Sequence, residues 1–453
     1  MKRKAITKIQ AVIIAVIVII VVVVGVVYYL ATLPPAAPPT TPPTTPPTTP
    51  STTPPTPTPT PTPTPPPKEY VVIGVAHTLS GPQAAACALH HAYYHMIVED
   101  YNAKGGLYVP EYGKRLRIKF IEYDDKNSID TMLTLVEKLI VEDKVDLLFA
   151  PWGTAFNFAV FPLTERYRYP LVALTFGSEI AAEKMRKGEF KYAFSVLGLP
   201  SETGKEIADL FEYINREITP IKRVGIIYHS DQHGVEYSGA IYSHLVMRGF
   251  EVPVHQSYPP DIADFTPLIS TLKTANVDVV ILCGYTEGAL FVHQCKAQNF
   301  NPKLIFVGPT MEVPGLVYGP FGFTPQDLIG VCYYDGWPAT AYKEPKLKEW
   351  AEEHKKRIGA YPFPASATFY AGIECLLKAV EKYGLNKDKI RDALATETFD
   401  TIVGKFRFRQ GYSAQCELAG TLTQWQGGDM MEVIWPREVA SAKIICPKPA
   451  WPS

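Results

Sequence analysis

The 453-residue sequence predicts an α/β fold: two doubly wound parallel-sheet lobes preceded by an N-terminal transmembrane helix. Three observations lead to this prediction. Short apolar runs alternate with segments whose apolar residues recur at helical spacing. The alternation falls into two series, and the second begins near residue 200. A long uncharged apolar run and a proline-rich stretch come before both series.

The predicted membrane element spans residues 1–32. Four basic side chains lie before residue 9, and residues 11–31 form an uncharged apolar run. A run of this kind is about as long as a helix needs to cross roughly 30 Å of hydrocarbon. No further positive charge occurs until Lys68, so the charge bias places the N-terminus in the cytoplasm and the rest outside. The alternative is a cleaved signal peptide, whose apolar region is normally shorter.

Residues 33–68 are expected to form a stalk. They consist mainly of proline and threonine. Proline fixes φ and lacks a backbone donor, so helix and sheet are excluded and an extended polyproline II segment is predicted. Such a stalk would hold a folded unit away from the membrane while keeping it tethered.

Composition excludes some functions. With 44 basic and 45 acidic residues the net charge is −1, which gives no reason to expect a nucleic-acid partner. The seven cysteines form no CxxC pair, and only Cys416 and Cys446 are considered for a disulfide. His91 and His95 have zinc-compatible spacing, but no HExxH motif and no third ligand is evident. We therefore expect no metal and no cofactor.

The first series is expected to form one α/β lobe. Its predicted strands cover residues 70–76, 116–123, 145–150 and 171–175, and its helices 89–101, 129–140 and 158–167. The second series has predicted strands at 223–228, 251–257, 277–283 and 304–308, with helices at 204–215, 238–248, 265–275 and 288–299. Later segments predict helices at 344–358, 367–383 and 387–395, and strands at 406–411 and within 420–434.

Small ligands bind open parallel sheets beyond the carboxyl ends of the strands. The loops at those ends are residues 77–83, 151–156, 176–179, 229–234, 284–287 and 309–313. Asp124 and Asp125 also follow a strand, and a role in a turn or helix cap is expected for them rather than catalysis. No activated nucleophile, phosphate-binding loop or GxSxG motif is found where catalysis would need one, so an enzyme is not expected.

Several stretches resemble one known family. IGVAHTLSGP at 73–82, DYNAKGGL at 100–107, EYDDK at 122–126 and GIIYHSDQHG at 225–234 are similar, in order and spacing, to the leucine/isoleucine/valine-binding type I periplasmic binding proteins. The resemblance covers residues 69 to about 411. It implies a first lobe of residues 69–198 and 335–405 and a second of 199–334 and 406–453. Three hinge segments are implied near Gly198, Asp335 and Lys405.

The resemblance also implies a binding site. In the family, loops after the third and fourth strands bind the ligand's carboxylate through hydroxyls and backbone N–H groups. The matching residues here are Trp152, Gly153, Thr154, Thr175, Phe176 and Gly177. Helix N-termini bind anions without a buried cation, so the assignment is physically sound. The alternative is that both threonines merely cap helices.

Second-lobe positions align at His233 and Tyr285, with a solvent-exposed loop histidine and a core tyrosine as the alternatives. The family's ammonium-binding acid has no direct counterpart, because Thr310 follows the last strand. Glu312 or Glu287 would have to supply the charge. The ligand class therefore stays open between a branched-chain amino acid, an amide or urea-like compound, and a carboxylate.

The expected function is that of an extracytoplasmic substrate-binding protein of an ABC importer. Its partners would be a small-molecule ligand and permease subunits in the membrane. The runner-up is a membrane-anchored ligand sensor with the same fold. The expected location is the cell membrane, with a single pass and the folded part outside the cytoplasm.

Overall fold

The computed structural model describes residues 67–308, 319–336, 345–359, 361–362, 365–409, 421–428 and 430–452. The expected anchor and stalk, up to residue 66, lie outside these ranges, as do Thr310, Glu312 and Cys416. Within the ranges, no helix has both the length and the apolar character needed to cross a membrane.

The first α/β region begins with a four-stranded sheet in the order β2-β3-β1-β4. The strands are β1 (Tyr70–His77), β2 (Leu107–Val109), β3 (Lys114–Asp124) and β4 (Leu147–Leu148). β1 runs parallel to β3 and β4, and β2 is antiparallel to β3. A second parallel pair is formed by β5 (Leu171–Ala173) and β6 (Ala193–Ser195).

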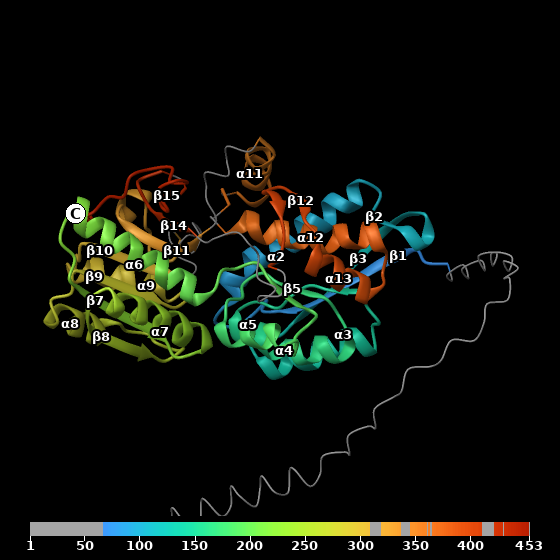
Figure 1. Ribbon diagram of the computed structural model, residues 1–453, viewed down its shortest axis with the longest axis horizontal. Coiled ribbons are helices and arrows are strands. Elements are labelled where there is room, and N and C mark those ends of the chain that lie inside the picture. The colour runs from blue at the N-terminus through green and yellow to red at the C-terminus, as the bar shows by residue number, and fades with distance from the viewer. Residues whose placement is uncertain are drawn as a thin grey trace, which may run out of the picture. The chain divides into compact units, whose positions relative to one another are not determined.

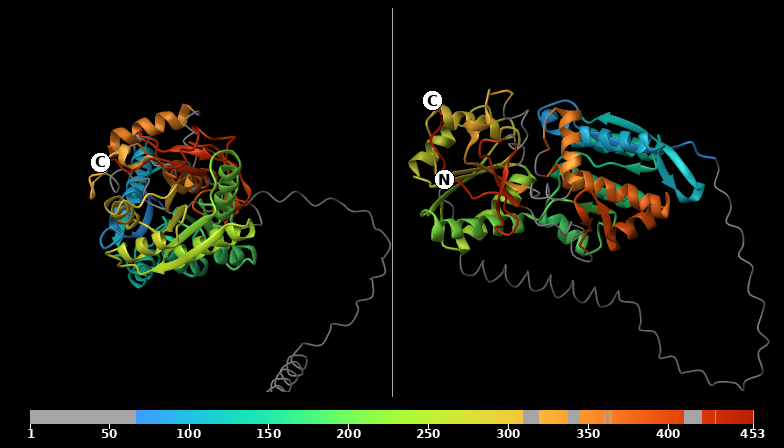
Figure 2. Two further views of the ribbon diagram at one scale, coloured as in Figure 1. Left: turned by 90° about the vertical axis from the view of Figure 1, so that its left-hand side faces the viewer. Right: turned by 90° about the horizontal axis from the view of Figure 1, so that it is seen from above.

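Helices flank these strands, as Figures 1 and 2 show. They are α2 (Ala84–Ala103), α3 (Ile129–Val141), α4 (Thr154–Tyr167) and α5 (Glu179–Arg186), with a 3₁₀ turn at Pro110–Tyr112. Late segments of the chain return to the same region: α11 (Pro345–Ile358), α12 (Ser366–Tyr383), α13 (Lys387–Thr396) and the hairpin of β12 (Phe399–Thr401) and β13 (Gly404–Phe406). α12 packs against α2 and β2.

The second region contains a seven-stranded sheet in the order β15-β14-β11-β10-β9-β7-β8. Five parallel strands are β7 (Arg223–His229), β8 (Glu251–Tyr258), β9 (Val279–Cys283), β10 (Leu304–Gly308) and β11 (Val331–Gly336). β14 (Thr421–Gln424) and β15 (Glu432–Trp435) extend the β11 edge with antiparallel pairing. The helices are α6 (Pro200–Glu217), α7 (Gln232–Met247), α8 (Thr266–Thr274) and α9 (Gly288–Ala297), with a 3₁₀ turn at Pro325–Leu328.

Both regions are built from two separate stretches of chain. In the first, buried side chains of β1 and α2 pack with Leu347, Trp350 and many residues of α12. In the second, buried residues of β7, β9 and β10 pack with Trp425 and Met431. The central strands β9 and β10 are apolar along their length, with five buried residues each. Strands covered by helices on both faces have this character.

Most predicted elements are present, but β2, β11 and β12 were not predicted, and the bounds of several elements differ. β6 and α5 were not predicted, because three and eight residues are too short to establish a period. The predicted helix at 158–167 begins earlier, at Thr154. The predicted strand at 406–411 is wrong in its bounds, since β13 ends at Phe406. Cys446 forms no disulfide with another described cysteine, and Cys416 lies outside the described residues, so their pairing stays a prediction.

Candidate functional site

The loop between β4 and α4 presents a helix N-terminus. Its N-cap residue, Gly153, has φ 90° and ψ 154°, and no side-chain hydrogen bond caps the helix. Asn157 stabilises the loop, because its Nδ2 donates to the carbonyls of Pro151 and Gly153 at 2.9 Å each. The first turn of α4 therefore offers backbone N–H groups to an anion.

Thr154 and Thr175 lie at this loop, and neither caps a helix through its side chain. Thr154 is buried and is the first residue of α4. The Thr175 hydroxyl oxygen accepts a hydrogen bond from the Gly153 N–H at 2.8 Å. The cap of α5 is Ser178, whose hydroxyl accepts from the N–H of Ala181. The helix-cap alternative is therefore wrong for both threonines, and the Thr175 O–H proton remains available to donate.

Phe176 and Gly177 have packing roles beside this loop. Phe176 is fully buried, and its ring meets that of Phe161 edge-on at 4.9 Å. A Cβ on Gly177 would lie 2.4 Å from the Tyr237 hydroxyl and 2.9 Å from the Gly198 carbonyl oxygen. The backbone at Gly177 thus approaches α7 more closely than a larger residue would allow.

In the second region, His233 and Tyr285 belong to one aromatic group. His233 lies in the first turn of α7 and is 5% exposed, so the expected alternative of a solvent-exposed loop histidine is wrong. Its ring is 5.3 Å from that of Tyr285 and 4.3 Å from that of Tyr237. Among the residues that the structure describes, no hydrogen-bond partner is found for its buried Nε2. Burial lowers the pKa of His233 to about 4, so the imidazole is neutral.

Asp231 holds Tyr285 in place and was not predicted as a site residue. Its carboxylate accepts the Tyr285 hydroxyl at 2.6 Å and the Gly234 N–H at 2.9 Å, and it lies 3.2 Å from Nδ1 of His229. Burial opposes its ionisation, but the hydrogen bonds from His229 and from the Gly234 N–H, together with the charge of His229, lower the pKa of Asp231. The group is therefore a carboxylate beside the aromatic cluster.

Contacts join the candidate loops of the two regions. The Trp152 ring lies 5.3 Å from that of Tyr285, and both pack with Ala86 and Cys87. The side-chain oxygens of Gln83 and Thr286 are 3.4 Å apart. Loops that follow strands in both regions are thus brought to one place, as expected for strand-end loops.

The loop after β1 is held by the two consecutive aspartates. Asp124 accepts the Ser80 hydroxyl at 2.6 Å and the N–H groups of Leu79 and Ser80. Asp125 accepts the Thr78 hydroxyl at 2.8 Å. The expected turn role of this pair is confirmed.

Glu287 and the histidines of α2 have partners that the sequence did not predict. Glu287 Oε1 accepts the Tyr258 hydroxyl at 2.9 Å and the Tyr285 N–H at 3.0 Å, so this carboxylate is engaged inside the second region. The expectation that His91 and His95 lack a further potential ligand is wrong, because Glu122 lies beside both.

A family profile described as periplasmic binding protein matches residues 70–429. The chain belongs to this family. The resemblance inferred from the sequence is thereby confirmed, and the α/β fold with it. A periplasmic binding protein binds a solute outside the cytoplasm and is not an enzyme.

Known proteins similar to this binding protein include relatives and solved structures. The Leu/Ile/Val-binding protein homolog 7 of Brucella abortus is 23% identical over 400 residues, covering 83% of this chain and 94% of that protein. The branched-chain amino acid transporter substrate binding protein of Streptococcus pneumoniae, in complex with isoleucine, superposes with a TM-score of 0.68 at 17% identity, covering 83% and 100%. A solute binding protein of R. palustris in complex with benzoate superposes with a TM-score of 0.68 at 16% identity, covering 84% of this chain and 98% of that protein.

The sequence did not predict three groups in this binding protein: Asp231, Glu122, and Glu236, whose carboxylate on α7 accepts the Ser178 hydroxyl at 2.8 Å. Asp231 had a usable signal, since it follows a strand and precedes α7 as its N-cap. Glu236 and Glu122 lie within a helix and a strand, where a charged side chain ordinarily faces solvent.

Proposed function

We propose that this protein captures a small carboxylate-bearing solute and delivers it to the permease subunits of an ABC importer. The observation that carries the proposal is the uncapped N-terminus of α4, with the Thr154 and Thr175 side chains beside it. A carboxylate there would accept backbone N–H groups and two hydroxyl protons. Trp152, Gly153, Phe176 and Gly177 shape the same loops.

The second region supplies the other wall of the proposed site. Tyr285 packs against Trp152, and His233 stands behind Tyr285 with a buried ring nitrogen that has no partner among the described residues. A neutral imidazole can donate to or accept from a polar solute group. Thr310 and Glu312 stay proposed contacts on the strength of the resemblance alone.

An α-amino acid of branched-chain type is the proposed ligand class. Its ammonium group needs a negative partner if it is removed from water. Asp231 is the best-placed carboxylate, since its side chain is 22% exposed and its pKa is lowered by its surroundings despite burial. A carboxylate accepts at about four lone-pair positions, so Asp231 can keep its bonds to Tyr285 and Gly234 and still accept an ammonium proton.

The test is calorimetric titration of the full-length protein with branched-chain amino acids, their amides, ureas and benzoate. Wild type should bind a member of this panel, and Thr154→Val should lose about tenfold or more in affinity, because a hydrogen bond to a charged group contributes about 1.5–3 kcal/mol. Thr134→Val is the matched control, since Thr134 is exposed on α3 and bonds only its own helix through the Asp130 carbonyl. Equal affinities in both variants would reject the site.

The membrane arrangement is a further part of the proposal. Residues 1–32 would form a cytoplasmic stub and an uncleaved anchor, and residues 33–68 an extended stalk. An intact Met1 in protein that resists alkaline extraction from membranes would support this. Protein recovered without its first 32 residues would refute it.

The lobe boundaries are also proposed. Lobe 1 comprises residues 69–198 and 335–405 and lobe 2 residues 199–334 and 406–453, with the hinge near Gly198, Asp335 and Lys405. Closure about this hinge would bring the loops onto the solute. Small-angle scattering of the full chain should show a smaller radius with ligand than without.

A further inference from the structure

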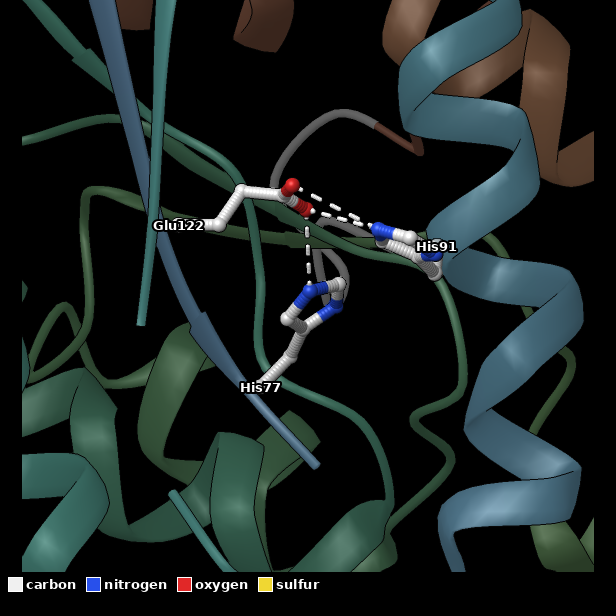
Figure 3. Close-up of side chains that lie close together, drawn as sticks. All are labelled: His77, His91 and Glu122. Atoms are coloured by element: carbon white, nitrogen blue, oxygen red, sulfur yellow. Dashed lines mark hydrogen bonds and ion pairs between the residues drawn. The ribbon is translucent and has the colours of Figure 1, made fainter. Parts of the chain in front are cut away.

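Side chains from two strands and one helix converge on a single carboxylate in the first region. β1 and β3 are parallel, with Val75 opposite Glu122 and His77 opposite Asp124. Residues two apart on a strand share a face, so His77 and Glu122 lie on the same side of the sheet. Figure 3 shows the rings of His77 and of His91, which lies on α2, both directed toward the Glu122 carboxylate.

The distances between these groups are short. His77 Nε2 lies 3.2 Å from Glu122 Oε1, and His91 Nε2 lies 3.1 Å from the same oxygen. The ligand atoms of His77, His91 and Glu122 all fall within 4.8 Å of one another. His95, one turn after His91, places its Nε2 2.8 Å from Glu122 Oε2.

These spacings fit a tetrahedral metal ion. Zn–N and Zn–O bonds of about 2.0–2.1 Å place neighbouring ligand atoms roughly 3.3 Å apart. The two nitrogen–oxygen distances at Oε1 are already 3.1 and 3.2 Å, so small side-chain rotations would accommodate the ion. His95 contacts the other oxygen of Glu122 and would orient this carboxylate from outside the coordination sphere.

Charge and burial agree with this geometry. His77 has no exposed side-chain surface, whereas those of His91 and Glu122 are 37% and 21% exposed, which leaves an approach from solvent. Neutral imidazoles and a carboxylate are the forms in which these side chains bind a metal ion, so the group offers one negative charge to the cation.

We propose that His77, His91 and Glu122 bind one Zn²⁺ ion, with water in the fourth position. Two imidazoles and a carboxylate form a donor set typical of zinc. The ion would join α2 to β1 and β3, and it would replace the contacts of His77 and His91 with Glu122 Oε1 by bonds to one centre.

The site adjoins the loops proposed to hold the solute. Nδ1 of His77 lies 3.8 Å from Cys87 Sγ, and Cys87 packs with Trp152 and Tyr285. A ring nitrogen that faces away from a metal is ordinarily fixed by a second contact, which orients the imidazole. The zinc proposal is nevertheless independent of which solute the protein binds, and no solute enters its test.

The experiment measures zinc on the full-length protein after chelator treatment and dialysis. Calorimetric titration with Zn²⁺ and elemental analysis should give one ion per chain. The double variant His91→Ala/His95→Ala and the single variant Glu122→Gln should each bind about tenfold or more weakly. His255→Ala is the matched control, because His255 is an exposed histidine in the second region, and it should bind as wild type does.

Two further measurements distinguish loss of the metal site from unfolding of a variant. Melting curves without metal show whether each variant is folded, which the exposure of His91 and His95 leads us to expect. Co²⁺ in place of Zn²⁺ should give visible d–d absorption in wild type and in His255→Ala, and lose it in the two site variants. No uptake by wild type, or equal affinity in every variant, would overturn the proposal.

Discussion

The Glu236 carboxylate accepts the backbone N–H of Glu179 at 2.6 Å, and so binds the N-terminus of α5 from α7. Its other oxygen accepts the Ser178 hydroxyl and the Gln232 side-chain amide, each at 2.8 Å. A negative group at a helix N-terminus is stabilised by the unpaired N–H groups and the helix dipole. Glu236 of the second region therefore binds the N-terminus of α5, whereas no side chain caps the N-terminus of α4.

Removing this carboxylate should weaken solute binding. Glu236→Ala loses two hydrogen bonds between α7 and the start of α5, and a closed form that depends on them becomes less populated. We expect the dissociation constant for the solute to rise about five- to thirtyfold, since about 1–2 kcal/mol is at stake. Calorimetry on the full chain measures it, with Glu217→Ala on the exposed end of α6 as control. An unchanged constant in Glu236→Ala would show that the contact plays no part in closure.

Gly153 should not tolerate a side chain. Its φ of 90° and ψ of 154° lie where residues other than glycine are strained, at a cost of about 1–3 kcal/mol. Gly153→Ala should therefore lower the melting temperature and weaken binding, because the loop must change shape at the N-terminus of α4. Gly239→Ala on α7 is the control: its Cβ would meet nothing within 4 Å, and alanine favours helix. Equal melting temperatures in the two variants would contradict the prediction.

His233 should make the protein less stable in acid. Its pKa is about 4 in the folded chain against an ordinary 6.5, because burial disfavours the charged ring; Asp231, His229, Tyr237 and Tyr285 face it. Between these values the unfolded chain binds the extra proton. The free energy of unfolding should therefore fall as pH drops from about 6.5 toward 4, by up to about 1.4 kcal/mol per pH unit from this group.

Urea unfolding at pH 7 and pH 5 tests the prediction. Between pH 7 and pH 5 the free energy of unfolding should fall less in His233→Phe than in wild type. Ser238→Ala on the same helix removes no titrating group, so its free energy of unfolding should fall as much as that of wild type. If the free energy of unfolding falls as much in His233→Phe as in wild type, groups other than His233 cause the acid sensitivity.

Asp231→Asn should affect the affinity for amino acids differently from the affinity for carboxylates without an ammonium group. If Asp231 accepts the ammonium of an amino acid, the variant should lose about tenfold or more in affinity for amino acids and keep its affinity for carboxylates without an ammonium. The amide can still accept the Tyr285 hydroxyl, so the aromatic group should remain in place. Asp261→Asn in an exposed loop is the control. A uniform loss across the panel would point to a packing role.

The sequence predicted the regular part of the fold because its signals are local. The buried run of β9 and the spacing of α12 each identify an element without knowledge of the rest. Gly153 and Thr175 were placed near each other correctly because both follow strands, yet their hydrogen bond could not be predicted. Glu122 and Glu236 acquire their roles from partners on other elements, and Asp231 contacts Tyr285, which is 54 residues away, in addition to its local N-cap bond. His77 and Glu122 are 45 residues apart, and no local pattern relates them.

Each hydrophobic core needs residues that are synthesised late. The first requires Phe369 and Phe406 beside strands that precede them in the chain, from β1 to β6, and the second requires Trp425 and Ile434. A chain interrupted before residue 400 would thus leave apolar surface uncovered in both halves at once, with the β11 edge unpaired and open to association. During biosynthesis, both halves would depend on a holding chaperone until almost the last residue has emerged.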